Sequence, residues 1–377
     1  MKALYEQVYA AIKKDILSGK YKIDDRVPSE KELSDQFKVS RITSKRALES
    51  LEKDGIVYRQ KGKGTFVSEK WEDALMNANK QKKPLIGLIL TDFDDTYGSK
   101  IISSIEYATS ETAFVILKRS FGSPEKEERL LKELLSIEVD GIIIYPAQAE
   151  HYSSEILKMV VDKFPFVLID RSFKGVAASS VSTDNVEAAK KGVEYLFKLG
   201  HKNIGVISPN EMGTTTLQDR FSGIVEAYAE KEVIVNKNLW CTNIKSTLAE
   251  PKSTQEEDIK EIEQYITNNP LLTALFAFEY NIARLAHQAV NNLGLHIPKD
   301  ISIICFDEPA LNIESWKFTR LVQNEEEIGK LAVKYLMDMI NGDDTIKQKK
   351  LSASLIVGDS TASVFEKMAQ NPAARRK

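Results

Sequence analysis

From residue 85 onward, short uninterrupted apolar runs alternate with longer segments of helical periodicity. Strands without polar interruptions are typical of parallel sheets that are covered on both faces, and regular alternation of strands and helices indicates an α/β architecture. The apolar runs outnumber the strands of one small sheet, so we expect an α/β fold with two subdomains and a cleft between them. The expected strands lie at 85–90, 113–117, 141–145, 166–169, 204–207, 275–278 and 301–305. The expected helices lie at about 98–109, 124–137, 154–163, 185–198, 216–230, 255–268, 280–292 and 325–340.

The first 68 residues have a different pattern. Apolar residues between positions 4 and 16 recur at spacings of three and four, which predicts an amphipathic helix. A second helix is expected after Ser29, which can form a capping box with Glu32, and a third is expected after the capping residue Ser40. Two short strands then flank a basic, glycine-rich tip at 61–64, as in a β-hairpin. This order of elements predicts a winged helix–turn–helix.

Charge is distributed unevenly along the chain. Residues 1–68 hold 15 Lys and Arg against 10 Asp and Glu, a net charge of +5, whereas the whole chain carries −3. A basic N-terminal unit on an acidic body fits a polyanionic partner, although an ordinary solvated surface would give the same balance. We expect a DNA-binding domain at 1–68, a polar linker at 69–83, a ligand-binding and dimerisation domain at 84–366 and a C-terminal tail at 367–377.

The start of the third helix carries most of the candidate DNA-contacting residues. A recognition helix places its N-terminal residues against base edges in the major groove, where Arg41 and Lys45 can donate to guanine or to phosphate. Hydroxyl side chains near helix N-termini can bind phosphate oxygens, and the hairpin tip can reach the backbone or a minor groove. The candidates are Ser40, Arg41, Thr43, Ser44, Lys45, Lys61 and Lys63. Taken singly, each basic residue could equally be a solvated side chain.

Several motifs in this region resemble the DNA-binding domain of GntR-type bacterial regulators. They are PSEKEL at 28–33, VSRITSKRAL at 39–48, and LEKDGIV at 51–57 followed by GKGTFV at 62–67. The resemblance covers about residues 3–68. It implies a set of operator contacts, namely Glu30, Arg41, Lys45 and Gly62. A valine and a glutamate are more usual where this chain has Ser44 and Arg46, so the resemblance does not extend to the operator sequence.

Polar residues follow several of the expected strands. In open α/β sheets, ligands bind beyond the C-terminal ends of the strands. The segments at these ends are 91–97, Asp170-Arg171, Glu279 and Asp307-Glu308, and Arg220 opens a later helix. Carboxylates and guanidinium groups at one edge can hydrogen-bond several hydroxyls, and an aromatic ring can cover the C–H face of a sugar, so the pattern predicts a polyol site. Each residue taken singly could instead be a cap or turn residue.

The same landmarks resemble LacI-type regulators and periplasmic sugar-binding proteins. They include IGLI at 86–89, VDGII at 139–143, LIDR at 168–171, RFSG at 220–223 and IICFD at 303–307. The resemblance covers about residues 84–365 and implies a periplasmic-binding-protein-like (type I) fold, with two subdomains joined by three crossovers and sugar bound in the cleft. The implied ligand contacts are Asp95, Tyr97, Arg171, Arg220, Glu279, Asp307 and Gln323. The family's usual Asn-Asp pair is Glu279-Tyr280 here, so the identity of the sugar is not implied.

The combination of a GntR-type DNA-binding domain with a LacI-type ligand-binding domain resembles the AraR group of carbohydrate regulators, which respond to arabinose. We therefore predict a homodimeric repressor that binds double-stranded operator DNA and releases it when a sugar effector binds. A phosphosugar, a nucleoside or another polar metabolite is the alternative effector. A third hypothesis is a sugar-binding module whose winged helix serves protein contacts.

Other classes of protein have little support in the sequence. Two distant cysteines give no disulfide framework, the first residues do not form a signal peptide, and no apolar run approaches the roughly 20 residues of a membrane span. We expect a cytoplasmic protein without membrane contact. The four histidines show no HExxH or HxH spacing, and no GxSxG or Walker A motif is present. We therefore expect no metal, no cofactor and no catalytic activity.

Overall fold

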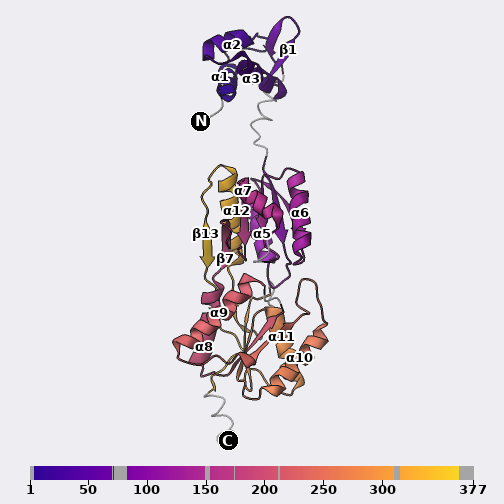
Figure 1. Ribbon diagram of the computed structural model, residues 1–377, viewed down its shortest axis with the longest axis vertical. Coiled ribbons are helices and arrows are strands. Elements are labelled where there is room, and N and C mark those ends of the chain that lie inside the picture. Colours follow the sequence, from indigo (N-terminus) through magenta and orange to yellow (C-terminus); the bar gives the residue numbers. More distant parts are fainter. Residues whose placement is uncertain are drawn as a thin grey trace, which may run out of the picture. The chain divides into compact units, whose positions relative to one another are not determined.

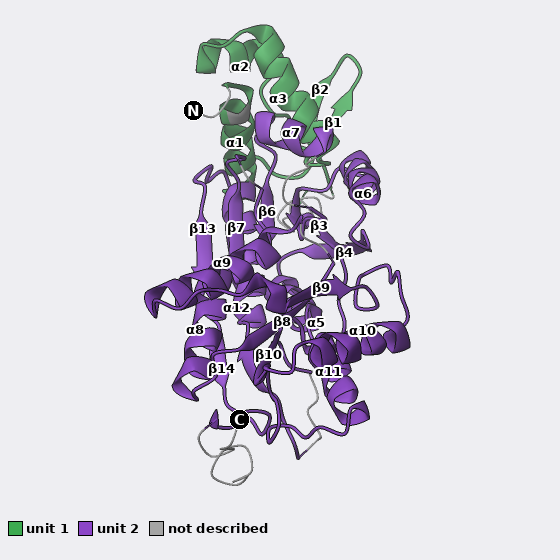
Figure 2. Cartoon of the chain, turned by 60° about the horizontal axis from the view of Figure 1, so that its bottom comes forward, with its two compact units in different colours: residues 1–83 green, residues 84–377 purple. Residues whose placement is uncertain are grey.

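The computed structural model describes residues 4–69, 71, 83–148, 153–173, 175–210, 213–309 and 315–364. The chain divides into two compact units, unit 1 (residues 1–83) and unit 2 (residues 84–377), which are coloured separately in Figure 2. Most of the expected linker and all of the expected C-terminal tail lie outside the described residues. No helix in the described part of the chain is both long enough and apolar enough to cross a membrane.

Over residues 4–67, unit 1 consists of helices α1 to α3 followed by a two-stranded antiparallel hairpin (Figure 1). These elements are α1 (Leu4–Leu17), α2 (Glu30–Phe37), α3 (Arg41–Lys53), β1 (Val57–Gln60) and β2 (Gly64–Val67). The predicted capping box starts α2, because the Glu32 N–H donates to Ser29 Oγ over 3.3 Å and the Ser29 N–H donates to the Glu32 carboxylate over 2.6 Å. Buried apolar side chains from α1, α2, α3 and the hairpin form one core. The predicted winged helix–turn–helix is confirmed.

The first subdomain of unit 2 is built on six parallel strands in the order β13-β7-β6-β5-β3-β4. The strands are β3 (Leu85–Leu90), β4 (Phe114–Arg119), β5 (Gly141–Ile144), β6 (Phe166–Ile169), β7 (Ser179–Thr183) and β13 (Gln348–Leu351). The helices are α5 (Ser99–Thr109), α6 (Pro124–Ser136), α7 (Ser154–Val161) and α12 (Glu325–Ile340). Because side chains alternate along a strand, one face of the sheet packs on α5 and α12 and the other on α6 and α7.

The second subdomain has a six-stranded sheet in the order β14-β12-β11-β10-β8-β9, parallel except for β14. Its strands are β8 (Ile204–Pro209), β9 (Trp240–Ile244), β10 (Ala274–Ala277), β11 (Ser302–Phe306), β12 (Thr319–Val322) and β14 (Ser354–Ile356). Its helices are α8 (Asn185–Lys198), α9 (Thr215–Glu230), the 3-10 helix η1 (Lys237–Leu239), α10 (Gln255–Asn268) and α11 (Tyr280–Asn292). Helices α8 and α9 cover one face of the sheet, and α10 and α11 cover the other.

The two subdomains are joined by crossovers. Within the described residues the chain passes between the sheets three times, at β7–α8, β12–α12 and β13–β14. Two of the crossovers touch, because the Thr183 hydroxyl donates to Gln323 Oε1 over 2.6 Å. The predicted α/β fold with two subdomains is confirmed.

The sequence pattern does not predict five of the strands, β7, β9, β12, β13 and β14. Strand β7 reads Ser-Ser-Val-Ser-Thr, and the exposed edge strand β13 reads Gln-Lys-Lys-Leu, so neither forms an apolar run. Such strands form by pairing with other strands of the sheet, β7 with both β6 and β13, and this pairing leaves little local signal.

Candidate functional site

The first turns of α3 expose both basic and apolar side chains to solvent. Ser40 caps the helix, since its Oγ accepts from the Thr43 N–H over 3.1 Å and lies 2.8 Å from the Thr43 hydroxyl. Arg41 and Lys45 are exposed. Ile42 lies between them and is 80% exposed. A major groove could be contacted here through guanidinium, ammonium and methyl groups together.

Ser44 does not belong to this surface. Its side chain is fully buried, and its hydroxyl has no hydrogen-bond partner among the described residues. Helical periodicity explains the difference, because Ser44 lies three, four and seven residues before Ala47, Leu48 and Leu51, which all face the core. The same spacing was available in the sequence and would have removed Ser44 from the predicted contacts.

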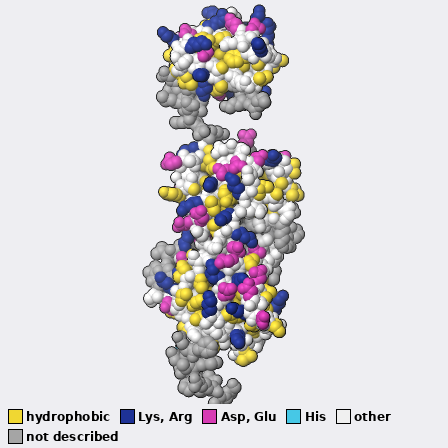
Figure 3. Space-filling view, turned by 90° about the vertical axis from the view of Figure 1, so that its left-hand side faces the viewer, with side chains coloured by type: hydrophobic (Ala, Val, Ile, Leu, Met, Phe, Trp, Pro, Cys, Tyr) yellow, Lys and Arg dark blue, Asp and Glu magenta, His cyan; other side chains and the backbone are white. Residues whose placement is uncertain are grey.

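The hairpin tip is basic and fully accessible. Lys61, Gly62 and Lys63 are all exposed, and Gly62 has a φ of +78°, a backbone conformation that favours glycine. At the base of the hairpin, Arg59 lies 3.7 Å from the Glu30 carboxylate and 3.0 Å from that of Glu52. The predicted contact residue Glu30 is therefore held in an ion pair with the wing. Figure 3 shows Lys and Arg side chains interspersed with acidic ones on the surface of unit 1.

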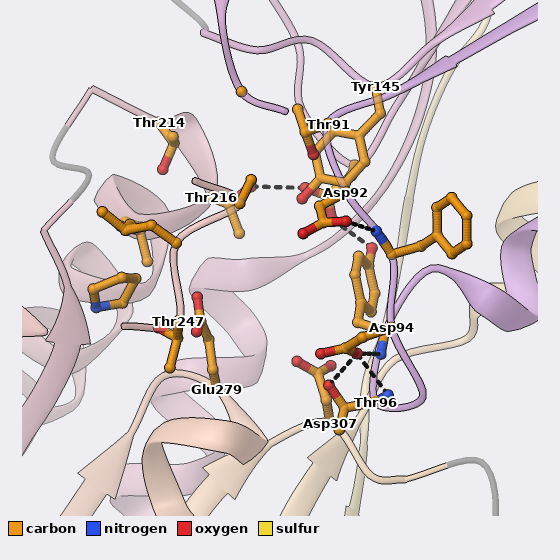
Figure 4. Close-up of a pocket in the computed structure, with 18 of the residues that line it drawn as sticks. Thr91, Asp92, Asp94, Thr96, Tyr145, Thr214, Thr216, Thr247, Glu279 and Asp307 are labelled. Carbon is orange, nitrogen blue, oxygen red and sulfur yellow. Dashed lines mark hydrogen bonds between the residues drawn. The ribbon is translucent and has the colours of Figure 1, made fainter. Parts of the chain in front are cut away.

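Unit 2 contains a cavity of about 160 Å³ between its two subdomains. In Figure 4, Thr91, Asp92, Asp94 and Tyr145 of the first subdomain face Thr214, Thr216, Thr247 and Glu279 of the second. Among the described residues, five carboxylates line the cavity, those of Asp92, Asp94, Asp170, Glu279 and Asp307. Two guanidinium groups also line it, those of Arg171 and Arg220. The lining is thus rich in hydrogen-bonding groups and has an excess of negative charge.

Asp170 connects the two walls of the cavity. It follows β6 and has a φ of +62°, in the left-handed region. The Tyr97 hydroxyl donates to Asp170 Oδ1 over 2.5 Å, and the Thr216 hydroxyl of the opposite subdomain donates to Asp170 Oδ2 over 3.2 Å. Burial raises the pKa of the Tyr97 hydroxyl well above its usual value, so Tyr97 serves as a neutral donor. The predicted residue Tyr97 is therefore placed in the cavity.

Asp307 follows β11 in a matching position, with a φ of +71°. Burial raises the pKa of its carboxyl to about 6, while Arg220 opposes that rise. Arg220 is itself buried, and its guanidinium carbon lies 3.6 Å from the centre of the Phe306 ring. Gln323 Nε2 donates to Asp307 Oδ1 over 2.7 Å. Asp307, Arg220 and Gln323, all predicted ligand residues, are thus brought together at the floor of the cavity.

Arg171 is held against the first subdomain. Its Nη1 donates to the carbonyls of Pro146 and Ala147 over 3.1 and 2.8 Å, and its guanidinium lies 4.9 Å from the Tyr145 ring centre. Glu127 accepts from the Ala147 N–H over 2.7 Å, and burial raises the pKa of that carboxyl to about 7. Arg171 and the half-buried Glu279 both line the cavity, as predicted from the sequence.

Asp95 is placed differently from the prediction. It is exposed and lines an adjoining cavity, whereas its neighbour Asp94 lines the main one. Asp94 Oδ1 accepts from the Thr96 and Tyr97 N–H groups over 2.7 and 3.0 Å, and Asp94 Oδ2 accepts from Asn281 over 2.8 Å. The turn that these bonds form directs the side chain of Asp94 inward, and it leaves that of Asp95 outside the main cavity.

Several lining residues were not among the predicted contacts. Asp94 and Asp170 lie in strand-end segments that the sequence analysis identifies, but the sequence does not show that their side chains point into the cavity. Thr216 and Thr247 belong to loops or helix starts without a motif, and no local signal marks them. The Thr247 hydroxyl is buried without a hydrogen-bond partner among the described residues, which leaves it available to a ligand.

Two protein families match the chain. Residues 4–67 match the gntR family of bacterial regulatory proteins, and residues 193–361 match the periplasmic binding protein-like domain. Both predicted resemblances are therefore confirmed. These are families of DNA-binding and ligand-binding domains rather than of enzymes.

Two relatives match over most of the chain, and a solved structure matches over part of it. The arabinose metabolism transcriptional repressor of Geobacillus stearothermophilus is 27% identical over 368 residues, which cover 96% of this chain and 98% of the relative. The repressor of the same name from Halalkalibacterium halodurans is 25% identical over 348 residues, 90% of each chain. The crystal structure of the transcription regulator CcpA of Lactococcus lactis superposes with a TM-score of 0.64 and 22% identity, over 74% of this chain and 99% of that one. That likeness establishes a common fold.

Proposed function

Because the chain joins a GntR-family DNA-binding domain to a periplasmic-binding-protein-like domain, we propose that it represses carbohydrate-utilisation genes and leaves its operator when a sugar binds. The observation that carries this proposal is the presence, in one chain, of an exposed basic wing and a cavity lined by carboxylates, hydroxyls and guanidinium groups. Two relatives that cover at least 90% of the chain are named as transcriptional repressors of arabinose metabolism, and they support the same conclusion.

The DNA contacts are proposed for the exposed end of α3 and for the wing. Arg41 and Lys45 would reach base edges or phosphates, and Ser40 and Thr43 would donate to phosphate oxygens near the helix N-terminus. Lys61, Gly62 and Lys63 would follow the backbone from the hairpin tip. Glu30, which is paired with Arg59, would orient the wing or accept from a cytosine amino group.

The effector is proposed to be a small neutral sugar. A cavity of about 160 Å³ lies below the roughly 300–1,000 Å³ that holds drug-sized ligands, so a single sugar ring suits it better than a nucleoside. Asp92 is paired with Arg119, so four carboxylates of the described lining remain against two guanidinium groups; they would repel a phosphate, which disfavours a phosphosugar. The contacts would come from Tyr97, Arg171, Arg220, Glu279, Asp307 and Gln323, together with Asp94 and Asp170. Arabinose is the first candidate for the sugar ring in this cavity because of the relatives' names.

Sugar binding would act through the crossovers. Gln323 lies in the β12–α12 crossover, contacts Thr183 at the end of β7, where the β7–α8 crossover begins, and donates to Asp307 in the cavity. A ligand that binds the closed arrangement of the subdomains more tightly than the open one shifts the population between them. We propose that the active species is a homodimer on a two-fold symmetric operator, in the cytoplasm where the chromosome lies.

Calorimetry on the full chain tests the effector class. Neutral pentoses and hexoses should bind, whereas the corresponding sugar phosphates should bind at least about tenfold more weakly, because the lining is acidic. The Arg220→Met variant should lose sugar binding, and Arg129→Met, on the surface of α6 and outside the cavity lining, is the matched control. Tighter binding of a phosphosugar or a nucleoside would refute the neutral-sugar proposal.

A further inference from the structure

We infer that the natural effector has a second sugar ring, which occupies a cavity beside the first, so that the ligand class is a neutral disaccharide or short oligosaccharide. This inference rests on the proposed function, in which the cavity between the subdomains binds a sugar. It names a second subsite and the residues that would form it.

The second cavity adjoins the first and is larger. Its volume is about 630 Å³, compared with about 160 Å³ for the first. Thr96, Thr247 and Asn281 line both cavities, so the boundary between them consists of a few side chains. The hydrogen bond of 2.8 Å from Asn281 to Asp94 lies at this boundary. The hydroxyls beside a glycosidic linkage could replace this hydrogen bond by bonding to Asn281 and Asp94 themselves.

The walls of the second cavity have the two features that a sugar ring requires. One wall is an aromatic cluster, in which the ring centres of Trp316 and Phe318 are 4.9 Å apart and those of His287 and Trp316 are 5.1 Å apart. Trp316 is half-buried and lines the cavity, so part of the indole can cover the apolar C–H face of a sugar. The remaining walls carry amide side chains, those of Gln255, Gln288 and Asn281, which suit neutral hydroxyls.

Two polar groups at this cavity lack partners in the described part of the chain. The Thr247 hydroxyl is buried at the boundary without a hydrogen bond. Arg284 is an exposed cation on α11 for which no ion pair or hydrogen bond with a described residue is present. Buried hydroxyls are normally satisfied, so the free Thr247 hydroxyl indicates a place for a ligand oxygen at the junction of the two rings.

The loop that supplies Thr247 is firmly anchored. Asp258 in α10 accepts from the Lys245 and Ser246 N–H groups over 2.9 and 2.7 Å and from the Ser253 hydroxyl over 2.8 Å. These hydrogen bonds hold the pKa of the Asp258 carboxyl below its usual value even though burial opposes them. The β9–α10 loop is therefore a pre-formed wall shared by both cavities, and binding need not order it first.

The test is calorimetry on the full chain with matched pairs of ligands. The pairs are L-arabinose with α-1,5-L-arabinobiose, D-xylose with xylobiose, and D-glucose with maltose and with cellobiose. At least one disaccharide should bind about tenfold or more tightly than its own monosaccharide, the factor expected when one face of an aromatic ring is covered. Trp316→Ala and Arg284→Ala should each reduce that gain and leave monosaccharide affinity unchanged. Lys299→Ala, an exposed residue outside both cavities, is the control.

The possible results separate this inference from the proposed function. Unchanged monosaccharide binding in the two variants shows that they are folded. If a monosaccharide binds as tightly as every disaccharide, or if the gain survives in both variants, the second subsite is refuted while the sugar-responsive function stands. If no neutral sugar binds to the unaltered protein, the proposed function fails and the inference fails with it.

Discussion

Asp307 should make the stability of unit 2 depend on pH in a way that one substitution removes. Burial raises the pKa of its carboxyl from 3.8 to about 6, so the folded chain binds this proton more tightly than the unfolded chain does. The stabilisation is therefore fully present below about pH 3.8 and is lost as the pH rises through about 6. Between about pH 4.5 and pH 7.5 the expected loss from this residue is about 2 kcal/mol.

Asp307→Asn is a clean perturbation because the backbone there has a φ of +71°. Asparagine tolerates this left-handed conformation as well as aspartate does, and its carbonyl oxygen can still accept from Gln323. The unfolding free energy of the variant should not contain this pH-dependent contribution of about 2 kcal/mol. The difference in unfolding free energy between the two proteins should therefore change by about 2 kcal/mol between about pH 4.5 and pH 7.5. Groups that titrate in both proteins cancel in this comparison.

Urea unfolding at a series of pH values measures the effect, with the fluorescence of Trp240 and Trp316 reporting on unit 2. Asp162→Asn, at an exposed position after α7, is the control and should follow the unaltered protein. Parallel pH profiles for Asp307→Asn and the unaltered protein would refute the assignment of a raised pKa to Asp307.

Three further predictions concern the two functions. Replacing Arg41 and Lys45 together with alanine should weaken operator binding about 100-fold and flatten its dependence on salt, as gel-shift titrations can show; an unchanged salt slope would contradict the proposed contacts. Ile42→Ala should cost about 1 kcal/mol of operator affinity through a lost contact with a thymine methyl, and deoxyuridine at that position of the operator should abolish the difference between the two proteins; a cost that persists with deoxyuridine argues against methyl recognition. Lys100→Met removes an ion pair of 3.4 Å with Glu308 across the cleft but outside the main cavity. It should raise the sugar concentration needed for operator release about two- to fivefold, and an unchanged release curve would show that this ion pair does not favour closure.

Local features of the chain could be predicted well from the sequence. The capping box of Ser29 and Glu32 and the cap at Ser40 depend on residues three positions apart, so their geometry follows from the sequence alone. The buried strands β3, β5 and β11 are apolar on both faces, and their composition distinguishes them from helices and loops. The edge strand β13 is not apolar and has no local capping motif, so it forms only through its pairing with β7.

The candidate site was only partly predictable, for a different reason. The sequence indicates that residues 91–97 lie at a strand end, but it does not show whether Asp94 or Asp95 points inward. That choice depends on the hydrogen bonds from Thr96 and Tyr97 to Asp94. Thr216 reaches Asp170 only because the two subdomains face each other. Contacts of this kind require the tertiary structure.

The central claim is that sugar binding and operator binding oppose each other. Fluorescence anisotropy with a labelled operator, obtained by selection from random duplexes, measures this most directly when the full chain is titrated with and without saturating sugar. The sugar should weaken operator affinity at least about tenfold, and the operator should weaken sugar affinity by the same factor, because the coupling is reciprocal. Two affinities that do not depend on each other would contradict it.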